Sequence, residues 1–320
     1  MRVDAIMKSL PLLCLGVIAV SCLASAAFNL PSMKAERWVN SPPLTPEALR
    51  GKVVLVDFWE YTCVNWIRTA PYVKAWDRQY APLGLIVVGV HTPEFEFGKR
   101  TEHIERGIRD HGLTYPIAID NDYAIWRAFG NDAWPATYLF DTRGRLVQRW
   151  AGEGSYDEIE REIRRLLVAA KPGIQLPAVT EEASAFAKTG QPSYAGITNE
   201  TYVGAEQREP GAVTLKGDWH TDRQYVELKK GTGEISLPFT GGEVNLVMQP
   251  GSSGHASVTV LLDGQPVGAA RGADVGADGV ARFDRSGMIR LVAGAPRRRH
   301  VLTLSSSDSG LRAYSFTFGP

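Results

Sequence analysis

Cys63 is the residue in this sequence with the clearest capacity for chemistry. It follows a nearly continuous apolar run over residues 53–59, which is typical of a strand buried on both faces, and it precedes a helical stretch. At the N-terminus of a helix, unpaired N–H groups and the positive end of the helix dipole favour a thiolate. The sequence therefore predicts a nucleophilic thiol whose pKa lies below its usual range.

Two carboxylates lie close to this cysteine in the sequence. Asp57 belongs to the apolar run, where desolvation would raise its pKa and let it exchange a proton with Cys63. It could equally be a strand-end aspartate that is hydrogen-bonded to backbone. Glu60 lies in the following loop, and we interpret it as a solvated charge.

His91 and Glu94 invite a metal-binding interpretation, which we reject. The chain has six histidines, but no second His or Cys stands at ligand spacing from this pair. We therefore expect no metal and no cofactor, and we interpret His91 as a loop residue after a strand.

The N-terminus has the layout of a secretory signal. Basic residues precede an apolar run over residues 12–20, and small residues follow, so we place a signal peptide at residues 1–26. The alternative is lipid anchoring through Cys22, whose preceding residues resemble a lipobox with Ala where Leu is usual. Cys14 and Cys22 lie in this leader, so cleavage would leave Cys63 as the sole cysteine of a periplasmic or secreted protein.

The elements that would position Cys63 alternate along residues 35–170. Apolar runs, helix-period stretches and a hairpin with a turn glycine predict the order β-α-β-α-β-β-α with an extra helix. This order gives a central mixed sheet with flanking helices. Ser155 and Glu158 form a capping box that would open the last helix.

The rest of the chain has a different texture. Residues 171–198 are rich in Ala, Pro, Gly and Ser, the composition of a flexible linker. Residues 199–320 carry short strand-like runs separated by Gly-rich turns, which predict an all-β sandwich. Lys+Arg and Asp+Glu balance at 35 each, which argues against nucleic acid as a partner.

Several motifs resemble thioredoxin-like proteins of the DipZ/TlpA type, and they follow the same order. The β region is similar to the carbohydrate-binding-like module that follows this domain in some DipZ-type proteins. The resemblance implies an α/β thioredoxin fold followed by the all-β domain. The matching segments are residues 57–66, 89–95, 120–123 and 134–139 in the first domain, and residues 200–202, 260–264 and 314–319 in the second.

In dithiol members of this family, a second cysteine three residues after the first releases the product. Here that position is Trp66, so a mixed disulfide at Cys63 could form but nothing within the chain could resolve it. One interpretation is an enzyme resolved by an external thiol or partner. Another is a degenerate site kept for binding, with Trp66 filling the hole over an unused cysteine. A third, a one-cysteine peroxidase, is disfavoured because Val56 and Glu60 stand where peroxiredoxins place Pro and Thr.

The resemblance also implies a substrate-docking edge. Pro135 would be a cis-proline facing Cys63, with the backbone at Trp134 docking an extended substrate; the alternative is an ordinary proline at a strand start. Trp59, Trp66 and Trp134 could form an aromatic surface around the thiol for peptide or apolar ligands, although Trp59 could equally be core.

We therefore expect an exported single-cysteine thiol–disulfide oxidoreductase. Cys63 would be the nucleophile and Asp57 the proton handler, with Trp66, Trp134 and Pro135 contacting substrate. Its partners would be protein or low-molecular-weight thiols and disulfides.

The alternative is a non-catalytic binding protein whose β module holds a glycan or a protein. Tyr202, Trp219 and Tyr225 are the candidates for stacking on sugar rings. Aromatic residues in a sandwich are more often core, which weighs against a sugar platform.

Overall fold

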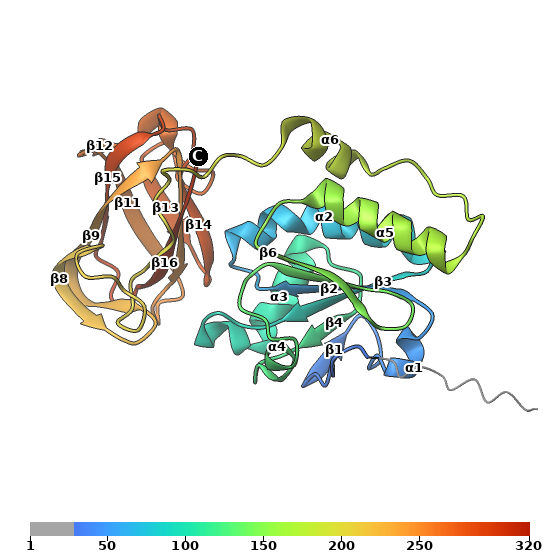
Figure 1. Ribbon diagram of the computed structural model, residues 1–320. Helices are drawn as coiled ribbons and strands as arrows, with labels where there is room; N and C mark the ends of the chain where they lie inside the picture. The colour runs from blue at the N-terminus through green and yellow to red at the C-terminus, as the bar shows by residue number, and fades with distance from the viewer. Residues whose placement is uncertain (1–28) are drawn as a thin grey trace, which may run out of the picture.

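The computed structural model describes residues 29–320, and the predicted signal peptide and Cys22 lie outside this range. Figure 1 shows an α/β domain, a connecting segment that carries α6 (Glu181–Thr189), and an all-β domain that ends at the C-terminus. Within the described residues, no helix has the length and apolar character needed to cross a membrane.

The first domain is built on a mixed sheet, as predicted. In the described residues this sheet has six strands in the order β1-β4-β3-β2-β5-β6. β2 pairs parallel with β3, and β3 pairs parallel with β4, whereas β1, β5 and β6 join antiparallel. The strands are β1 (Arg37–Val39), β2 (Val53–Trp59), β3 (Leu85–His91), β4 (Ile117–Ile119), β5 (Ala136–Phe140) and β6 (Leu146–Ala151).

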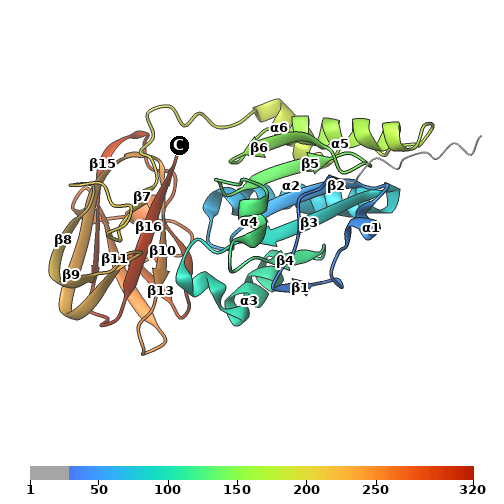
Figure 2. The ribbon, with the colours of Figure 1, turned by 60° about the horizontal axis from the view of Figure 1, so that its bottom comes forward.

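β2 lies in the interior of the sheet between β3 and β5 (Figure 2). Leu55 and Trp59 pack in the core that contains α2 and α5, while Val54 and Phe58 pack in the core that contains Ile125 of α4. Every β2 residue is therefore buried, as the apolar run predicts. The helices are α1 (Pro46–Leu49), α2 (Val64–Tyr80), α3 (Thr101–His111), α4 (Ala124–Ala128) and α5 (Tyr156–Ala170), with short 3-10 turns η1 (Ala81–Leu83) and η2 (Glu96–Lys99).

The predicted capping box at the start of α5 is wrong. Ser155 adopts a left-handed conformation with a φ of 54°, and its side chain makes no capping hydrogen bond to the described residues of α5. The helix still begins at Tyr156 because its buried residues, among them Ile159 and Ile163, pack on the sheet.

The segment over residues 171–198 carries structure of its own. Thr180 caps α6 by accepting a 3.3 Å hydrogen bond from the Ala183 N–H. The Thr180 N–H donates to the buried carboxylate of Glu160 on α5 at 2.8 Å. Trp76 and Tyr80 of α2 donate to the same carboxylate at 3.0 and 2.5 Å, so this part of the segment is fixed to the first domain.

The second domain is all-β, as predicted. Its described strands form a continuous antiparallel sheet that encloses a separate apolar core. Its main path runs β12-β11-β15-β9-β16-β10-β14. The strands are β7 (Thr201–Tyr202), β8 (Thr214–Thr221), β9 (Val226–Gly241), β10 (Glu243–Gln249), β11 (Ala256–Leu262), β12 (Gln265–Pro266), β13 (Val280–Phe283), β14 (Gly287–Val292), β15 (Arg298–Ser306) and β16 (Arg312–Gly319), with a 3-10 turn η3 (Gly268–Ala270).

Candidate functional site

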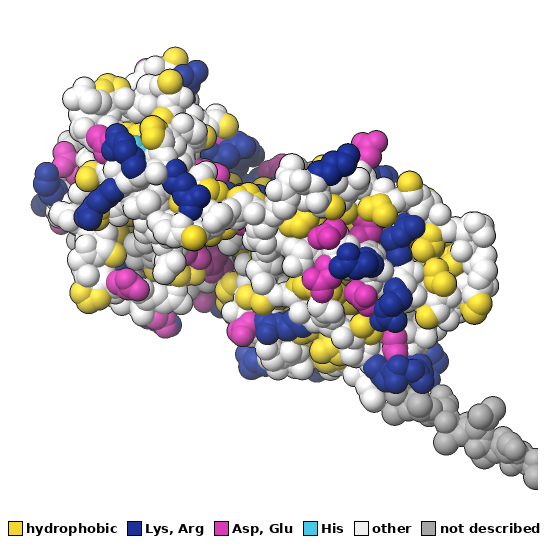
Figure 3. Space-filling model, turned by 45° about the horizontal axis from the view of Figure 1, so that its top comes forward, with side chains coloured by type: hydrophobic (Ala, Val, Ile, Leu, Met, Phe, Trp, Pro, Cys, Tyr) yellow, Lys and Arg dark blue, Asp and Glu magenta, His cyan; other side chains and the backbone are white. Residues whose placement is uncertain are grey.

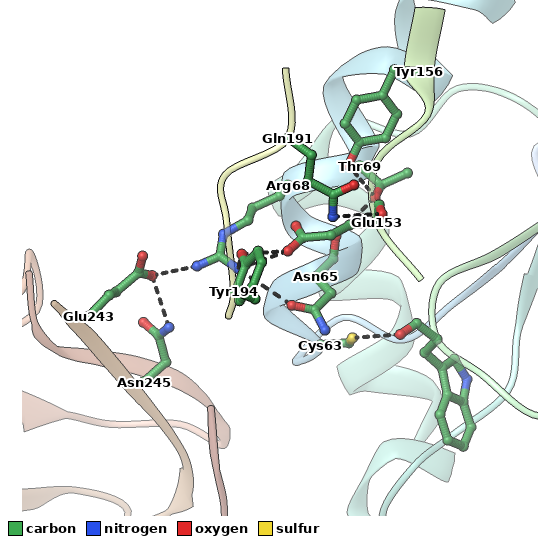
Figure 4. A network of polar contacts seen from close by, with 11 residues as sticks. Cys63, Asn65, Arg68, Thr69, Glu153, Tyr156, Gln191, Tyr194, Glu243 and Asn245 are labelled. Carbon is green, nitrogen blue, oxygen red and sulfur yellow. Dashed lines mark hydrogen bonds and ion pairs between the residues drawn. The ribbon is translucent and has the colours of Figure 1, made fainter. Parts of the chain in front are cut away.

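Cys63 lies at the N-cap of α2, directly after β2 and its short loop. The Sγ of Cys63 donates a weak hydrogen bond to the backbone oxygen of Trp134 at 3.7 Å (Figure 4). The Trp134–Pro135 peptide bond is cis, which confirms the isomer expected at Pro135. The thiol and the docking edge implied by the resemblance therefore meet in the fold.

The pKa of the Cys63 thiol is raised well above its usual value, so the predicted lowering is wrong. The backbone N–H of Trp66 lowers this pKa, which is the effect expected at a helix N-terminus. Burial and the carboxylate of Glu94 outweigh it, and Glu200 and Glu60 add smaller contributions in the same direction. The thiol at rest is therefore protonated.

Trp66 is fully buried, so it does not form part of an aromatic surface around the thiol. Its Nε1 donates a 2.9 Å hydrogen bond to Oδ2 of Asp57, and its ring packs on Trp59 with centroids 4.7 Å apart. The expectation that Trp66 contacts substrate is therefore wrong, since the indole packs against Trp59 of β2 and His111 of α3 in the core. Trp59 is likewise core.

Asp57 is the buried carboxylate that the sequence predicts. Burial raises its pKa to about 7, and the hydrogen bond from Trp66 lowers it by less. Its Oδ1 has no hydrogen-bond partner among residues 29–320, so one carboxylate oxygen remains able to hold a proton.

Glu60 is not the solvated charge expected from the sequence. It is fully buried, and its Oε2 accepts hydrogen bonds from the Thr62 N–H at 2.6 Å and from the Thr62 hydroxyl. Burial raises its pKa to about 8. Tyr61 packs in the core, and its neighbours Glu60 and Thr62 are buried as well, so the loop before Cys63 folds inward.

His91 is the last residue of β3 and is fully buried, rather than a loop residue. Its ring stacks on Tyr61 and meets Trp59 edge to face, and burial lowers its pKa to about 3. In the part of the chain that the structure describes, no group of three His, Cys, Asp or Glu side chains could hold a metal ion.

The second domain reaches the thiol site, which sequence reasoning missed. Tyr202 of β7 donates a 2.6 Å hydrogen bond from its hydroxyl to Oε1 of Glu94. Tyr314 of β16 packs on Phe95 and Phe97, with ring centroids 4.9 and 4.8 Å apart. Tyr225 packs on Tyr314 in turn. Tyr202 and Tyr225, two candidates for sugar stacking, therefore lie in the contact between the domains.

Arg68 of α2 ties the two domains together through a polar network (Figure 4). Its guanidinium donates to Glu243 of β10 at 2.8 Å, to the hydroxyl of Tyr194 at 3.1 Å and to Glu153 at 3.4 Å. Asn245 donates to the same Glu243 oxygen at 3.0 Å. The helix that begins at the thiol is thus bonded to the second domain.

Comparison with known proteins agrees with this architecture. Residues 30–167 match the Redoxin family, and residues 180–319 match a family described as thioredoxin like C-terminal domain. The chain is 34% identical over 310 residues to Protein DipZ of Mycobacterium tuberculosis, which covers 88% of this chain and 41% of DipZ. It is 30% identical over 139 residues to the thiol-disulfide oxidoreductase YkuV of Bacillus subtilis, covering 43% of this chain and 93% of YkuV.

A solved thioredoxin-like protein in its oxidised form is 32% identical, with a TM-score of 0.41, and covers 44% of this chain and 95% of that protein. The fold, the cis-proline and the matches to the Redoxin family and to YkuV show that the chain belongs to the thioredoxin-like superfamily and is thiol–disulfide oxidoreductase-like. The similarity to DipZ extends over both domains of the chain, which spans about two fifths of the length of DipZ.

Proposed function

We propose that this chain is a single-cysteine thiol–disulfide oxidoreductase that acts outside the cytoplasm, with Cys63 as the nucleophile. The observation that carries the proposal is the 3.7 Å approach of the Cys63 Sγ to the Trp134 carbonyl, directly before the cis-proline Pro135. An extended substrate that pairs with the backbone at Trp134 would bring its disulfide to the thiol.

The proposed reaction is a thiol–disulfide exchange. The Cys63 thiolate attacks one sulfur of a disulfide RS–SR, a bond forms between Sγ and that sulfur, and the other sulfur leaves as a thiolate. Cys63 is oxidised and the leaving sulfur is reduced. A low-molecular-weight thiol then attacks the mixed disulfide and regenerates Cys63, because Trp66 occupies the position of a resolving cysteine.

Asp57 is the proposed proton acceptor. Its raised pKa of about 7 and its unpartnered Oδ1 within the described residues suit a carboxylate that takes a proton near neutral pH. Because Cys63 is protonated at rest, the exchange needs such an acceptor or a change in the charges around the thiol.

The test is the reaction of Cys63 with a small neutral disulfide across pH, in folded and in unfolded protein. We expect the folded protein to form a mixed disulfide that an added thiol reverses, with a pH midpoint above that of unfolded protein, and Cys63→Ser to form none. A thiol that reacts only after unfolding would overturn the proposal.

A second candidate is a non-catalytic binding protein that retains a thioredoxin fold. It is favoured by Trp66, whose fully buried indole replaces a resolving thiol, and by the contact of Tyr202 with Glu94 beside Cys63. In this case the β module would hold a protein or a glycan, with Trp219 as the remaining half-exposed candidate for stacking. A cellular phenotype that survives in Cys63→Ser would favour this function over the first.

The proposed location outside the cytoplasm is based on the N-terminal sequence, which has the layout of a secretory signal. The surface fits a protein that does not bind polyanions, since basic and acidic side chains are interspersed over both domains on the face shown in Figure 3. Fractionation of cells that express the tagged full chain would test this location. Detection of the tagged protein in the cytoplasmic fraction alone would refute it.

A further inference from the structure

A cleft lies at the junction of the two domains, beside the thiol. Its volume is about 240 Å³, which suits a small ligand or one side chain rather than a folded protein surface. Both domains contribute its walls. The lining residues are Glu94, Phe95, Tyr123 and Trp134 from the first domain, and Tyr202, Gly204, Glu206, Gln207, Arg223 and Gln224 from the second.

Three of these residues connect the cleft to Cys63. The backbone oxygen of Trp134 accepts the hydrogen bond from Sγ. Glu94 is the charged group that most strongly raises the pKa of the thiol. Tyr202 binds Glu94 through the 2.6 Å hydrogen bond from its hydroxyl. A ligand in the cleft would therefore lie against the groups that surround the thiol.

The charges that line the cleft do not cancel. Arg223 is the only cation among the lining residues, and both oxygens of Glu206 accept from its Nη2 at 2.8 and 3.0 Å. The hydrogen-bond partner of Glu94 is the hydroxyl of Tyr202. Burial raises the pKa of Glu94, and the hydrogen bond from Tyr202 lowers it by less. The described residues therefore leave Glu94 as a carboxyl group without a paired cation.

Four of the lining residues are aromatic. Phe95, Tyr123, Trp134 and Tyr202 line the same small space as Glu94. Aromatic faces attract cations through their quadrupole, and most strongly where water is partly excluded. A carboxyl group among aromatic rings is an arrangement that suits an ammonium group.

We propose that this interdomain cleft binds the ammonium group of a small amine-bearing disulfide and so selects cationic substrates for Cys63. The inference rests on the proposed function and names its substrate class. An ammonium group beside Glu94 would offset the charge that most strongly opposes ionisation of the thiol, so the substrate would also help to form the thiolate. The exchange itself proceeds as described above, with the amine-bearing thiol as the leaving group.

Binding can be tested without the thiol reaction. Hexamethylenediamine has the length and the two ammonium groups of the disulfide cystamine but cannot react, and adipate is its dianionic counterpart. In calorimetric titrations of the full chain, we expect hexamethylenediamine to bind and adipate not to bind. Glu94→Gln should weaken the diamine by about tenfold, the effect of removing one close charge. Glu181→Gln, which removes an exposed carboxylate of α6, should leave binding unchanged.

Reactivity gives the second readout. We would measure the rates at which Cys63 reacts with cystamine and with the dianion dithiodipropionate. Each rate is divided by the rate of the same disulfide with unfolded protein, which cancels the difference between the leaving groups. The normalised rate should be about tenfold or more higher for cystamine. This preference should disappear in Glu94→Gln and persist in Glu181→Gln.

The outcomes separate the two proposals. Failure of the diamine to bind, or equal binding by wild type and Glu94→Gln, would overturn the cation-binding cleft even if Cys63 reacts. Diamine binding that depends on Glu94, together with a thiol that reacts with no disulfide in folded protein, would support the cleft and overturn the oxidoreductase. If Glu94→Gln does not fold, Tyr202→Phe takes its place. Loss of the hydrogen bond that lowers the Glu94 pKa would leave this carboxyl group more protonated, so the preference for cystamine should shrink, and an unchanged preference would count against the cleft.

Discussion

The indole Nε1 of Trp66 donates a 2.9 Å hydrogen bond to Oδ2 of Asp57. The residue at the position of a second cysteine is thus bonded to the buried carboxylate that we propose as the proton acceptor. The contact is fully buried, with Trp59 packed on the same indole. Trp66 therefore fills the space of the missing thiol and also partners a carboxylate that burial would otherwise leave unsatisfied.

Restoring the second thiol is the first prediction. In Trp66→Cys, the new cysteine would stand three residues after Cys63 in α2, at the spacing of a dithiol site. We expect an internal disulfide to form under oxidising conditions, detected as the loss of both free thiols. Removal of the buried indole leaves a cavity, so the reduced variant should lose about 3 kcal/mol of unfolding free energy.

Trp66→Phe is the matched control, since it shrinks the ring and removes the hydrogen bond to Asp57 without adding a thiol. It should be destabilised and form no internal disulfide. Two free thiols in fully oxidised Trp66→Cys would show that the helix start cannot bring the two sulfurs together.

Asp57 should make the stability depend on pH. Its pKa is about 7 in the folded protein and about 3.9 in an unfolded chain. Between these pH values the folded state binds more protons, so the free energy of unfolding falls as the pH rises from about 4 to about 7. In Asp57→Asn this fall should be reduced. At pH 8 the free energy of unfolding of the variant should exceed that of the wild type by about 2 kcal/mol or more.

Urea unfolding at several pH values from 4.5 to 8 measures this effect, and Asp110→Asn, an exposed change on α3, serves as the control. A part of the slope should remain in Asp57→Asn, because the pKa of Glu60 is also raised, to about 8. An unchanged slope in Asp57→Asn would mean that Asp57 is ionised in the folded protein.

Glu94 should control ionisation of the thiol. Glu94→Gln removes the charge that most strongly raises the pKa of Cys63 but leaves the burial in place. We expect the pH midpoint for reaction with a neutral disulfide to fall by about one unit, with Glu181→Gln unchanged. A midpoint that does not move would assign the raised pKa to burial alone.

Local sequence patterns predicted the buried strand β2 and the place of Cys63 at the start of a helix, because each depends on residues that are neighbours in the chain. The cis bond before Pro135 was implied by the resemblance to thioredoxin-like proteins. Local patterns did not predict the direction of the thiol pKa. That direction is a balance between the Trp66 N–H, which is local, and burial with Glu94 and Glu200, which tertiary folding brings together.

The interior position of Glu60 was missed for a related reason. A glutamate in a loop is usually solvated, and nothing in the sequence shows that Tyr61 and Thr62 would turn inward with it. Tyr202 was interpreted as a candidate for stacking on sugar rings, and its contact with Glu94 was missed because Glu94 lies 108 positions away in another domain. Contacts between domains leave no periodic signal in a sequence.

We expect Arg68 to hold the two domains in their relative position. Arg68→Gln keeps a polar side chain but loses the ion pair with Glu243 at 2.8 Å and the longer one with Glu153 at 3.4 Å. Because Arg68 is half-buried, both carboxylates would lose a partly desolvated cation, at a cost of about 1 to 3 kcal/mol. The cleft beside Cys63 has walls from both domains, so a looser contact should also widen it.

The measurements are small-angle scattering and the reactivity of Cys63 in the full chain. We expect a larger radius of gyration in Arg68→Gln, and a faster reaction of Cys63 with bulky protein disulfides than in wild type, while the reaction with small disulfides changes less. Arg78→Gln, an exposed arginine on the same helix, is the control. An unchanged radius with unchanged reactivity would show that the other contacts between the domains, among them that of Tyr314 with Phe95 and Phe97 and that of Tyr202 with Glu94, are enough to hold the domains together.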